Sequence, residues 1–287
     1  MGKGSYRTIF CTVFLLTIFV LFNPFEFVLN AIEIQSEEII TIESRPKIKQ
    51  AFMLIKCQNP LASIILFAGG EGNIELGHLN DKPTIGALRD NFLIKTMRDF
   101  ANYGFMVAVY DVPSDQKKKG MSTIWRMEEK HADDINAIAL YLKKQATIPV
   151  WLVGTSKGTI SAVNGAIRIK ENINGLILTS SVTKYKKSWE KAYETHPNGI
   201  LDMDLDIIKV PTLIVSHRDD KCEVTPPADA KKLKSALINS PRTDVLTFTG
   251  GNKAESNPCW GNSPHGFYGI EEQVVKAIAE FIKSNSK

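Results

Sequence analysis

The feature that most constrains this chain is a short apolar run, residues 150–153, followed by Gly-Thr-Ser-Lys-Gly at 154–158 and a helix-compatible run at 159–170. A strand that passes into a helix through Gly-x-Ser-x-Gly turns sharply, and a side chain at either glycine would collide with a neighbouring strand or helix. Such a turn lifts the Ser156 hydroxyl above the sheet and leaves a backbone N–H at the helix start unpaired. The pentapeptide alone also fits a plain tight turn with a capping serine, so its meaning depends on the rest of the chain.

Strands and helices alternate along the chain on both sides of this turn. Besides the run before Ser156, strands are predicted at 38–43, 50–57, 63–68, 105–110, 175–179, 211–216 and 244–248, and helices at 91–103, 123–144, 159–170, 228–238 and 271–283. The helix at 123–144 turns Ile135, Ile138 and Leu142 to the core, and His131 to the surface. This alternation predicts an α/β fold, a doubly wound and mostly parallel sheet with helices on both faces. Ligands bind such sheets at the carboxyl ends of the strands.

The composition excludes several classes of protein. The chain has 287 residues and is 44% hydrophobic, which fits one large α/β domain or two small ones with ample core. Its formal net charge of +4 comes mainly from scattered lysines, and the one tight run, at 117–119, falls in a predicted loop. The sequence contains no nucleic-acid motif, heptad pattern, internal repeat or low-complexity tract. We therefore expect no nucleic-acid partner, and the oligomeric state stays open.

The first 31 residues differ in character from the rest. Two basic side chains precede an uncharged apolar run at 9–22. A basic start followed by a short apolar run is typical of a Sec-type signal peptide. If the segment is not cleaved, residues 9–29 are long enough to anchor the chain in a membrane. Both alternatives predict export, so that the domain at 32–287 works in the periplasm or outside the cell.

Polar residues and glycines with chemical potential follow several predicted strands. Asp219 and Asp220 come just past one strand, His265 lies in a loop between the last strand and the last helix, and Gly69–Gly70 follows an earlier strand. Taken singly, aspartates and glycines are common in turns and a loop histidine is often merely exposed. Together, at the carboxyl ends of parallel strands, they would gather around Ser156. A serine nucleophile needs such partners: a base, a residue that orients the base, and an oxyanion hole.

The order Ser156, Asp220, His265, with Gly69–Gly70 upstream, resembles the α/β-hydrolase superfamily over residues 37–287. The loops at 154–158 and 265–267 are most similar to the esterase and dienelactone-hydrolase-like branches. The resemblance implies that Ser156 is the nucleophile, His265 the general base and Asp220, in preference to Asp219, the acid that orients it. It further implies that neither a metal nor an organic cofactor takes part, and that any lid is small.

The resemblance also implies where an oxyanion hole should form. One donor would be the backbone N–H of Lys157, the residue after the nucleophile. The second would be the N–H of Gly70 or Glu71, where glycine lets the backbone approach a substrate closely.

Three functions fit these residues. The first is an exported serine hydrolase that cleaves an ester or related acyl bond of a small molecule. The second is an acyltransferase that uses the same three side chains but passes the acyl group to an alcohol or amine. The third is a binding protein without catalysis on a hydrolase scaffold, since fold alone does not dictate function.

Two of the four cysteines are candidates for a disulfide. One cysteine lies within the first 31 residues, and Cys57 lies in a predicted core strand, where a buried thiol is ordinary. Cys222 comes two residues after Asp220, and Cys259 six residues before His265. If that acid and base meet, their loops are neighbours, so we predict a Cys222–Cys259 bond that an oxidising compartment preserves.

Overall fold

The computed structural model describes residues 1–2 and 33–286. Apart from residues 1–2, the predicted signal peptide or anchor at 1–31, with its possible membrane span at 9–29, therefore lies outside the described residues. In the described part, no helix is both long enough and apolar enough to cross a bilayer.

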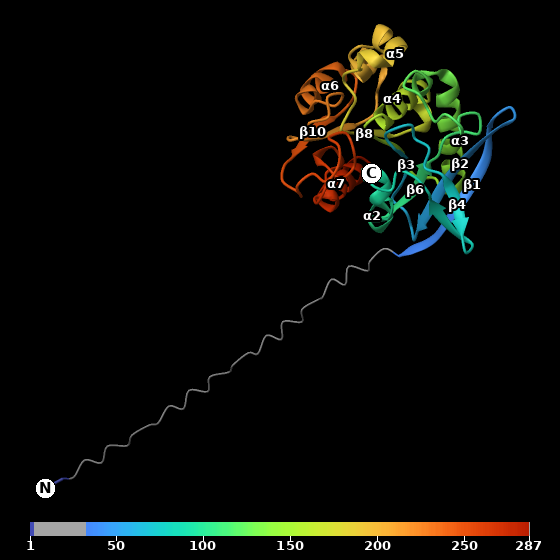
Figure 1. Cartoon of the computed structure of the whole chain (residues 1–287). Coiled ribbons are helices and arrows are strands. Elements are labelled where there is room, and N and C mark those ends of the chain that lie inside the picture. The colour runs from blue at the N-terminus through green and yellow to red at the C-terminus, as the bar shows by residue number, and fades with distance from the viewer. Residues whose placement is uncertain (3–32, 287) are drawn as a thin grey trace. The chain divides into compact units, whose positions relative to one another are not determined.

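A sheet of eight strands forms the centre of the fold, in the order β1-β2-β6-β3-β7-β8-β9-β10 (Figure 1). The strands are β1 (Ile34–Arg45), β2 (Ile48–Cys57), β3 (Ala62–Phe67), β6 (Phe105–Tyr110), β7 (Val150–Thr155), β8 (Gly175–Thr179), β9 (Thr212–His217) and β10 (Thr243–Phe248). From β6 to β10 every neighbouring pair is parallel, while β1 and β2 join antiparallel at one edge. The prediction of a mostly parallel sheet is confirmed.

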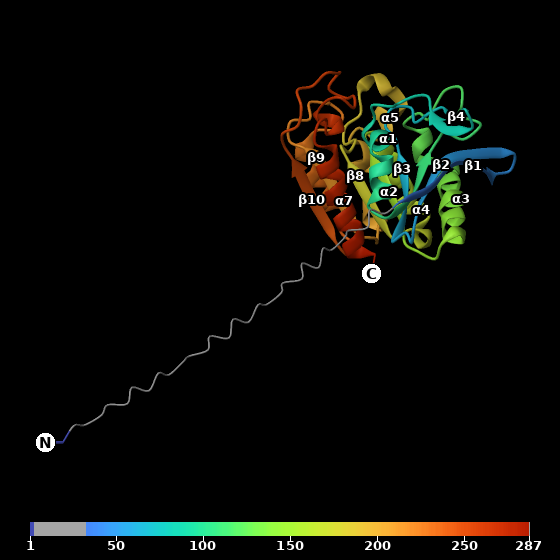
Figure 2. The ribbon, with the colours of Figure 1, turned by 90° about the horizontal axis from the view of Figure 1, so that it is seen from below.

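Helices cover both faces of this sheet (Figure 2). They are α1 (Phe92–Lys95), α2 (Met97–Asn102), α3 (Glu129–Gln145), α4 (Gly158–Arg168), α5 (Glu190–Thr195), α6 (Ala230–Ala236) and α7 (Glu271–Asn285). Helices α1, α2 and α7 pack on one face, and α3, α4 and α6 on the other. Strand β3 shows the consequence: Ile65 and Phe67 enter one core, and Ile64 and Leu66 the other. Because both faces of the sheet are covered, the sequence of β3 is a continuous, largely apolar run.

Two predicted helices are interrupted. The single helix predicted at 91–103 is wrong, because Thr96 (φ −103°, ψ 7°) separates α1 from α2 and its hydroxyl donates to the carbonyl of Phe92 (2.8 Å). The single helix predicted at 123–144 is also wrong. It starts with the 3₁₀ turn Trp125–Met127, and the extended Glu128 then precedes α3. The carbonyl of Glu128 accepts a bond from the Asn164 amide (2.9 Å) on α4, a contact that local propensity does not contain.

The third difference is at 228–238, where a 3₁₀ turn, Pro227–Asp229, precedes the shorter α6. The hairpin of β4 (Leu76–Leu79) and β5 (Lys82–Ile85) was not predicted. Its strands are short and partly exposed, so they lack the apolar pattern of the central sheet.

His131 is buried, not on the surface of its helix as predicted. The ring of Trp125, in the turn before α3, lies 4.7 Å from the imidazole, and the Tyr110 hydroxyl is 3.2 Å from Nδ1. The 3₁₀ turn before α3 therefore covers His131, although hydrophobic periodicity assigns this helix position to the solvent-exposed face.

Candidate active site

Ser156 lies on a strained turn between β7 and α4. Its φ is +53°, in the left-handed region that non-glycine residues rarely adopt. Two backbone hydrogen bonds hold the turn: the Ser156 N–H donates to Thr179 on β8 (3.1 Å), and the Thr159 N–H donates to the Ser156 carbonyl (2.9 Å). The strain is thus opposed by the neighbouring strand and by the first turn of the helix.

Both glycines of the motif are required by close backbone contacts. A Cβ atom on Gly154 would lie 2.5 Å from the carbonyl oxygen of Gly158. A Cβ atom on Gly158 would lie 2.0 Å from the carbonyl oxygen of Phe67, at the end of β3. Gly154 is therefore packed against the start of α4, and Gly158 against the end of β3, as the sequence predicted from the motif.

Asp220 and His265 meet beside this turn, although 45 residues separate them. His265 Nδ1 lies 3.0 Å from Asp220 Oδ2, and both side chains are at least nine-tenths buried. The other carboxylate oxygen of Asp220 accepts the backbone N–H of Cys222 (2.8 Å). Asp219 instead is half-exposed beside Arg218 (3.4 Å). Of the two predicted acids, Asp220 is the one placed against the histidine.

A third side chain, Thr225, contacts both members of this pair, and the sequence did not predict it. Its hydroxyl donates to Asp220 Oδ2 (2.9 Å) and lies 3.1 Å from His265 Nδ1. The side chain is buried. A threonine before two prolines carries no sequence signal for such a role, because the contact depends on how the loop after β9 folds back.

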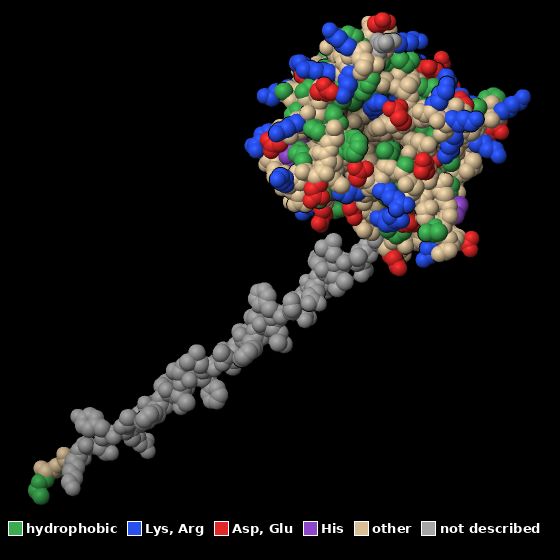
Figure 3. All heavy atoms as spheres, viewed as in Figure 1, with side chains coloured by type: hydrophobic (Ala, Val, Ile, Leu, Met, Phe, Trp, Pro, Cys, Tyr) green, Lys and Arg blue, Asp and Glu red, His purple; other side chains and the backbone are tan. Residues whose placement is uncertain are grey.

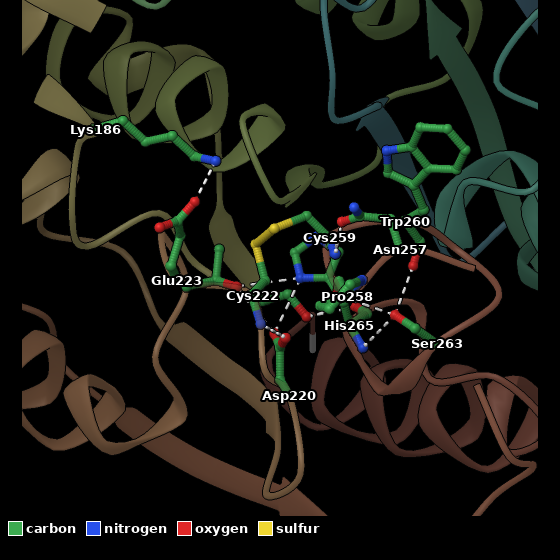
Figure 4. Close-up of a disulfide and its surroundings, with 12 residues drawn as sticks. Lys186, Asp220, Cys222, Glu223, Asn257, Pro258, Cys259, Trp260, Ser263 and His265 are labelled. Atoms are coloured by element: carbon green, nitrogen blue, oxygen red, sulfur yellow. Dashed lines mark hydrogen bonds and ion pairs between the residues drawn. A yellow bond between two sulfur atoms is a disulfide. The ribbon is translucent and has the colours of Figure 1, made fainter. Parts of the chain in front are cut away.

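Hydrogen bonds to the backbone of His265 hold its loop, and the one between His265 and Ser263 is drawn in Figure 4. Ser180, just past β8, donates its hydroxyl to the His265 carbonyl (2.7 Å). The Ser263 hydroxyl accepts the His265 N–H (3.2 Å). The two bonds hold the His265 backbone at its carbonyl and at its N–H, and in this way they position the imidazole.

A pocket of about 310 Å³ contains Ser156 and His265 in its wall. Gly69 and Gly70 line it as well, and Leu88 and Trp260 contribute apolar surface. In the described residues, no hydrogen bond joins the Ser156 hydroxyl to His265. In enzymes without a ligand such a bond is often long and shortens only in the complex.

The backbone donors predicted for an oxyanion hole lie at this pocket or next to it. Within the described part of the chain, the N–H groups of Lys157, Gly70 and Glu71 have no hydrogen-bond partner. Gly70 lines the pocket, whereas Glu71 turns its carboxylate to the Lys157 ammonium (2.6 Å). The geometry therefore favours Gly70 over Glu71 as the second donor.

Comparison with known proteins supplies a fold and no sequence relative. No protein-family model and no curated protein matches the chain. Among solved structures, an esterase from Pyrococcus furiosus superposes with a TM-score of 0.60, covering 88% of this chain and 92% of that one at 13% identity. A dienelactone hydrolase from Anabaena variabilis gives 0.58, covering 88% and 99% at 11% identity. The chain has the α/β-hydrolase fold. A serine hydrolase without a lid from Xanthomonas campestris gives 0.53, covering 89% and 97% at 11% identity.

Two further features of this α/β-hydrolase fold concern its lid segment and the loops that carry Asp220 and His265. The segment between β8 and β9 contains only short helical turns and the six-residue α5, in agreement with the prediction of a small lid. A disulfide, Cys222–Cys259, joins the loop that carries Asp220 to the loop that leads to His265 (Figure 4). In the described residues, no cluster of three or more His, Cys, Asp or Glu side chains forms a metal site.

Proposed function

We propose that this protein is a serine hydrolase that cleaves an ester or related acyl bond of a small molecule. The observation that carries the proposal is the buried Asp220–His265 pair at the pocket that also contains the strained Ser156. Strain at a serine flanked by a base and by unpaired N–H groups is typical of a nucleophile.

In the proposed reaction, Ser156 Oγ attacks the carbonyl carbon while His265 accepts its proton. Asp220 accepts the Nδ1–H of the ring and stabilises the imidazolium that forms. The N–H groups of Lys157 and Gly70 hold the negative oxygen of the tetrahedral intermediate. His265 then protonates the leaving alcohol, an acyl-enzyme forms on Ser156, and water, deprotonated by His265, releases the acid.

The small-molecule substrate that we propose agrees with the charge distribution on the surface as well as with the pocket. Basic and acidic side chains are interspersed over the face seen in Figure 3, without a broad field of one sign. Such a surface offers no stripe of positive charge for a nucleic-acid backbone. The reaction steps above need no cofactor.

We further propose that the domain is exported. The disulfide supports an oxidising compartment, where such bonds persist. The basic and apolar start of the chain supports passage across a membrane, either with cleavage or with retention of residues 9–29 as an anchor. Fractionation of the native host checks this, because full-length soluble protein in the cytoplasm would exclude both forms of export.

The decisive experiment is covalent labelling with a fluorophosphonate probe, together with turnover of p-nitrophenyl acetate. We expect Ser156 to be labelled, and S156A to lose labelling and several orders of magnitude in kcat. The matched control is S63A, which removes a buried hydroxyl without a hydrogen-bond partner on β3. Folded wild-type protein that neither reacts with the probe nor turns over esters would leave the binding-protein alternative.

Acyl transfer is the second candidate, because the same acyl-enzyme can be opened by an alcohol or amine instead of water. Product analysis with graded concentrations of a primary alcohol separates the two. Free acid as the main product at low alcohol concentration supports hydrolysis. A predominant transesterified product under those conditions would favour the transferase.

A further inference from the structure

Arg126 is a buried cation that the proposed reaction leaves without a role. It lies in the 3₁₀ turn Trp125–Met127 and has no exposed surface. Its Nη2 donates to the carbonyl oxygens of Ala68 (3.3 Å) and Gly70 (3.1 Å), and its Nη1 donates to the Ser161 hydroxyl (2.6 Å). One guanidinium therefore contacts both the loop after β3 and the helix that begins after Ser156.

The loop is shaped around this guanidinium. The N–H of Gly72 donates to the Gly69 carbonyl (3.2 Å) and closes a turn. A Cβ atom on Gly72 would lie 2.6 Å from Arg126 Nη2, and the φ of +73° at this glycine is unfavourable for other residues. Space for the guanidinium thus depends on a glycine at that position.

The hydrogen bonds of Arg126 all go to neutral acceptors. In the described residues, no carboxylate forms an ion pair with it, and Nε has no partner. Burial lowers the pKa of Arg126 to about 10, so the guanidinium stays protonated at neutral pH. Burial of this cation costs free energy, which the charge of the nearby Glu71 only partly offsets. A guanidinium carries its donors in a rigid planar fork, so it can hold several acceptors in fixed directions at once.

We propose that Arg126 positions the oxyanion hole. Each carbonyl shares a planar peptide group with the N–H of the next residue, so Arg126 fixes the peptide groups on both sides of the one that carries the Gly70 N–H. The carbonyl of that central peptide, on Gly69, is held by the Gly72 N–H. The contact with Ser161 ties the same guanidinium to α4, whose first turn follows the Lys157 N–H. The inference rests on the proposed function, and it assigns Arg126 to positioning, not to contact with the substrate.

The test is R126K, which keeps a positive charge but cannot reach three acceptors with a planar fork. We expect kcat for p-nitrophenyl acetate to fall by about 10- to 100-fold, less than the roughly 100- to 1,000-fold loss on removal of an oxyanion-hole donor, with KM changed less than about threefold. The rate of fluorophosphonate labelling should fall in parallel, because the phosphoryl oxygen occupies the same donors. The matched control is R45K, which breaks a similar fork to Asp134 (2.8 and 3.0 Å), and it should keep wild-type kcat.

A kcat for R126K within twofold of wild type would overturn the inference, and so would an equal loss in R45K. If R126K does not fold, S161A decides. It removes one anchor of the guanidinium, and we expect several-fold lower kcat at unchanged KM, whereas wild-type kcat would overturn the inference. An unlabelled, inactive wild type would instead overturn the proposed function, and the inference with it.

Discussion

The Thr225 hydroxyl contacts both members of the proposed acid–base pair. It donates to the same carboxylate oxygen of Asp220 that faces His265 Nδ1. A hydroxyl in this position restricts rotation of the carboxylate, and hydrogen bonds to a charged acceptor are stronger than neutral ones. Activity should therefore depend on the hydroxyl and not on the threonine methyl group.

We predict that T225V lowers kcat by about tenfold, the factor that corresponds to roughly 1.4 kcal/mol, with little change in KM. T225S keeps the hydroxyl and should retain most of the activity. Steady-state kinetics of the two variants with the same ester checks this. Equal rates for T225V and T225S would show that the hydroxyl does not position Asp220.

The two adjacent aspartates make a second prediction at this scale. Asp220 contacts His265, whereas Asp219 is half-exposed, so D220N should lower kcat by orders of magnitude and D219N by little. The two substitutions are chemically identical and one residue apart, so kcat ratios compare them directly. A crippled D219N beside an active D220N would reverse the assignment.

Among the elements, the loop after β9 and the loop before His265 form one unit because a disulfide joins them. Cys222 and Cys259 are 37 residues apart in sequence, and Cys259 also lines the pocket. Closing a loop of this length stabilises the folded state by about 4 kcal/mol in the chain-entropy estimate. The bond also holds the loop that carries Asp220 against the loop that leads to His265.

We predict that reduction lowers both the thermal midpoint and the activity, and that the double variant C222S/C259S reproduces both losses without reductant. The matched control is C57S, which alters a buried cysteine outside the disulfide and should leave the sensitivity to reductant unchanged. Thermal unfolding and ester turnover with and without reductant measure the effect. Peptides of Cys222 and Cys259 that alkylate freely without reductant would contradict the bond in the exported protein.

For the whole molecule, the buried imidazole of His131 on α3 links the stability of the fold to pH. Burial is the largest cause that lowers the pKa of His131 well below its usual value, followed by the charges of Arg126 and Arg45. The folded state thus keeps this imidazole neutral, while the unfolded chain binds a proton below pH about 6.5. Since the unfolded state binds more protons there, stability falls as the pH falls.

We predict a loss of about 2 kcal/mol from this residue between pH 7 and pH 5. H131Q, a neutral side chain that can still bond Tyr110, should flatten the dependence of the unfolding free energy on pH. H78Q, at an exposed position of β4, should keep the wild-type slope. Denaturant unfolding at the two pH values measures the difference, and parallel curves for H131Q and wild type would refute the role of His131.

Most of the fold could be predicted from local pattern, because continuous apolar runs mark strands covered on both faces and alternate with amphipathic helices. The strands at Phe105–Tyr110 and Gly175–Thr179 have the predicted bounds. Helix interruptions at Thr96 and Glu128 were missed, since they arise from contacts between elements and from a local side-chain bond that periodicity does not register.

By itself, the sequence determined which strand each candidate residue follows, because Gly-x-Ser-x-Gly and the aspartates and histidine after later strands are local features. Only the tertiary structure decided which of them touch. It put Asp220 rather than Asp219 against His265, brought Thr225 within reach of both, and buried Arg126 against the loop after β3. The physical reason is that Thr225 and Asp220 contact His265 across 40 and 45 residues of sequence. The choice between two adjacent aspartates depends on how the backbone turns after β9. Local spacing encodes neither property.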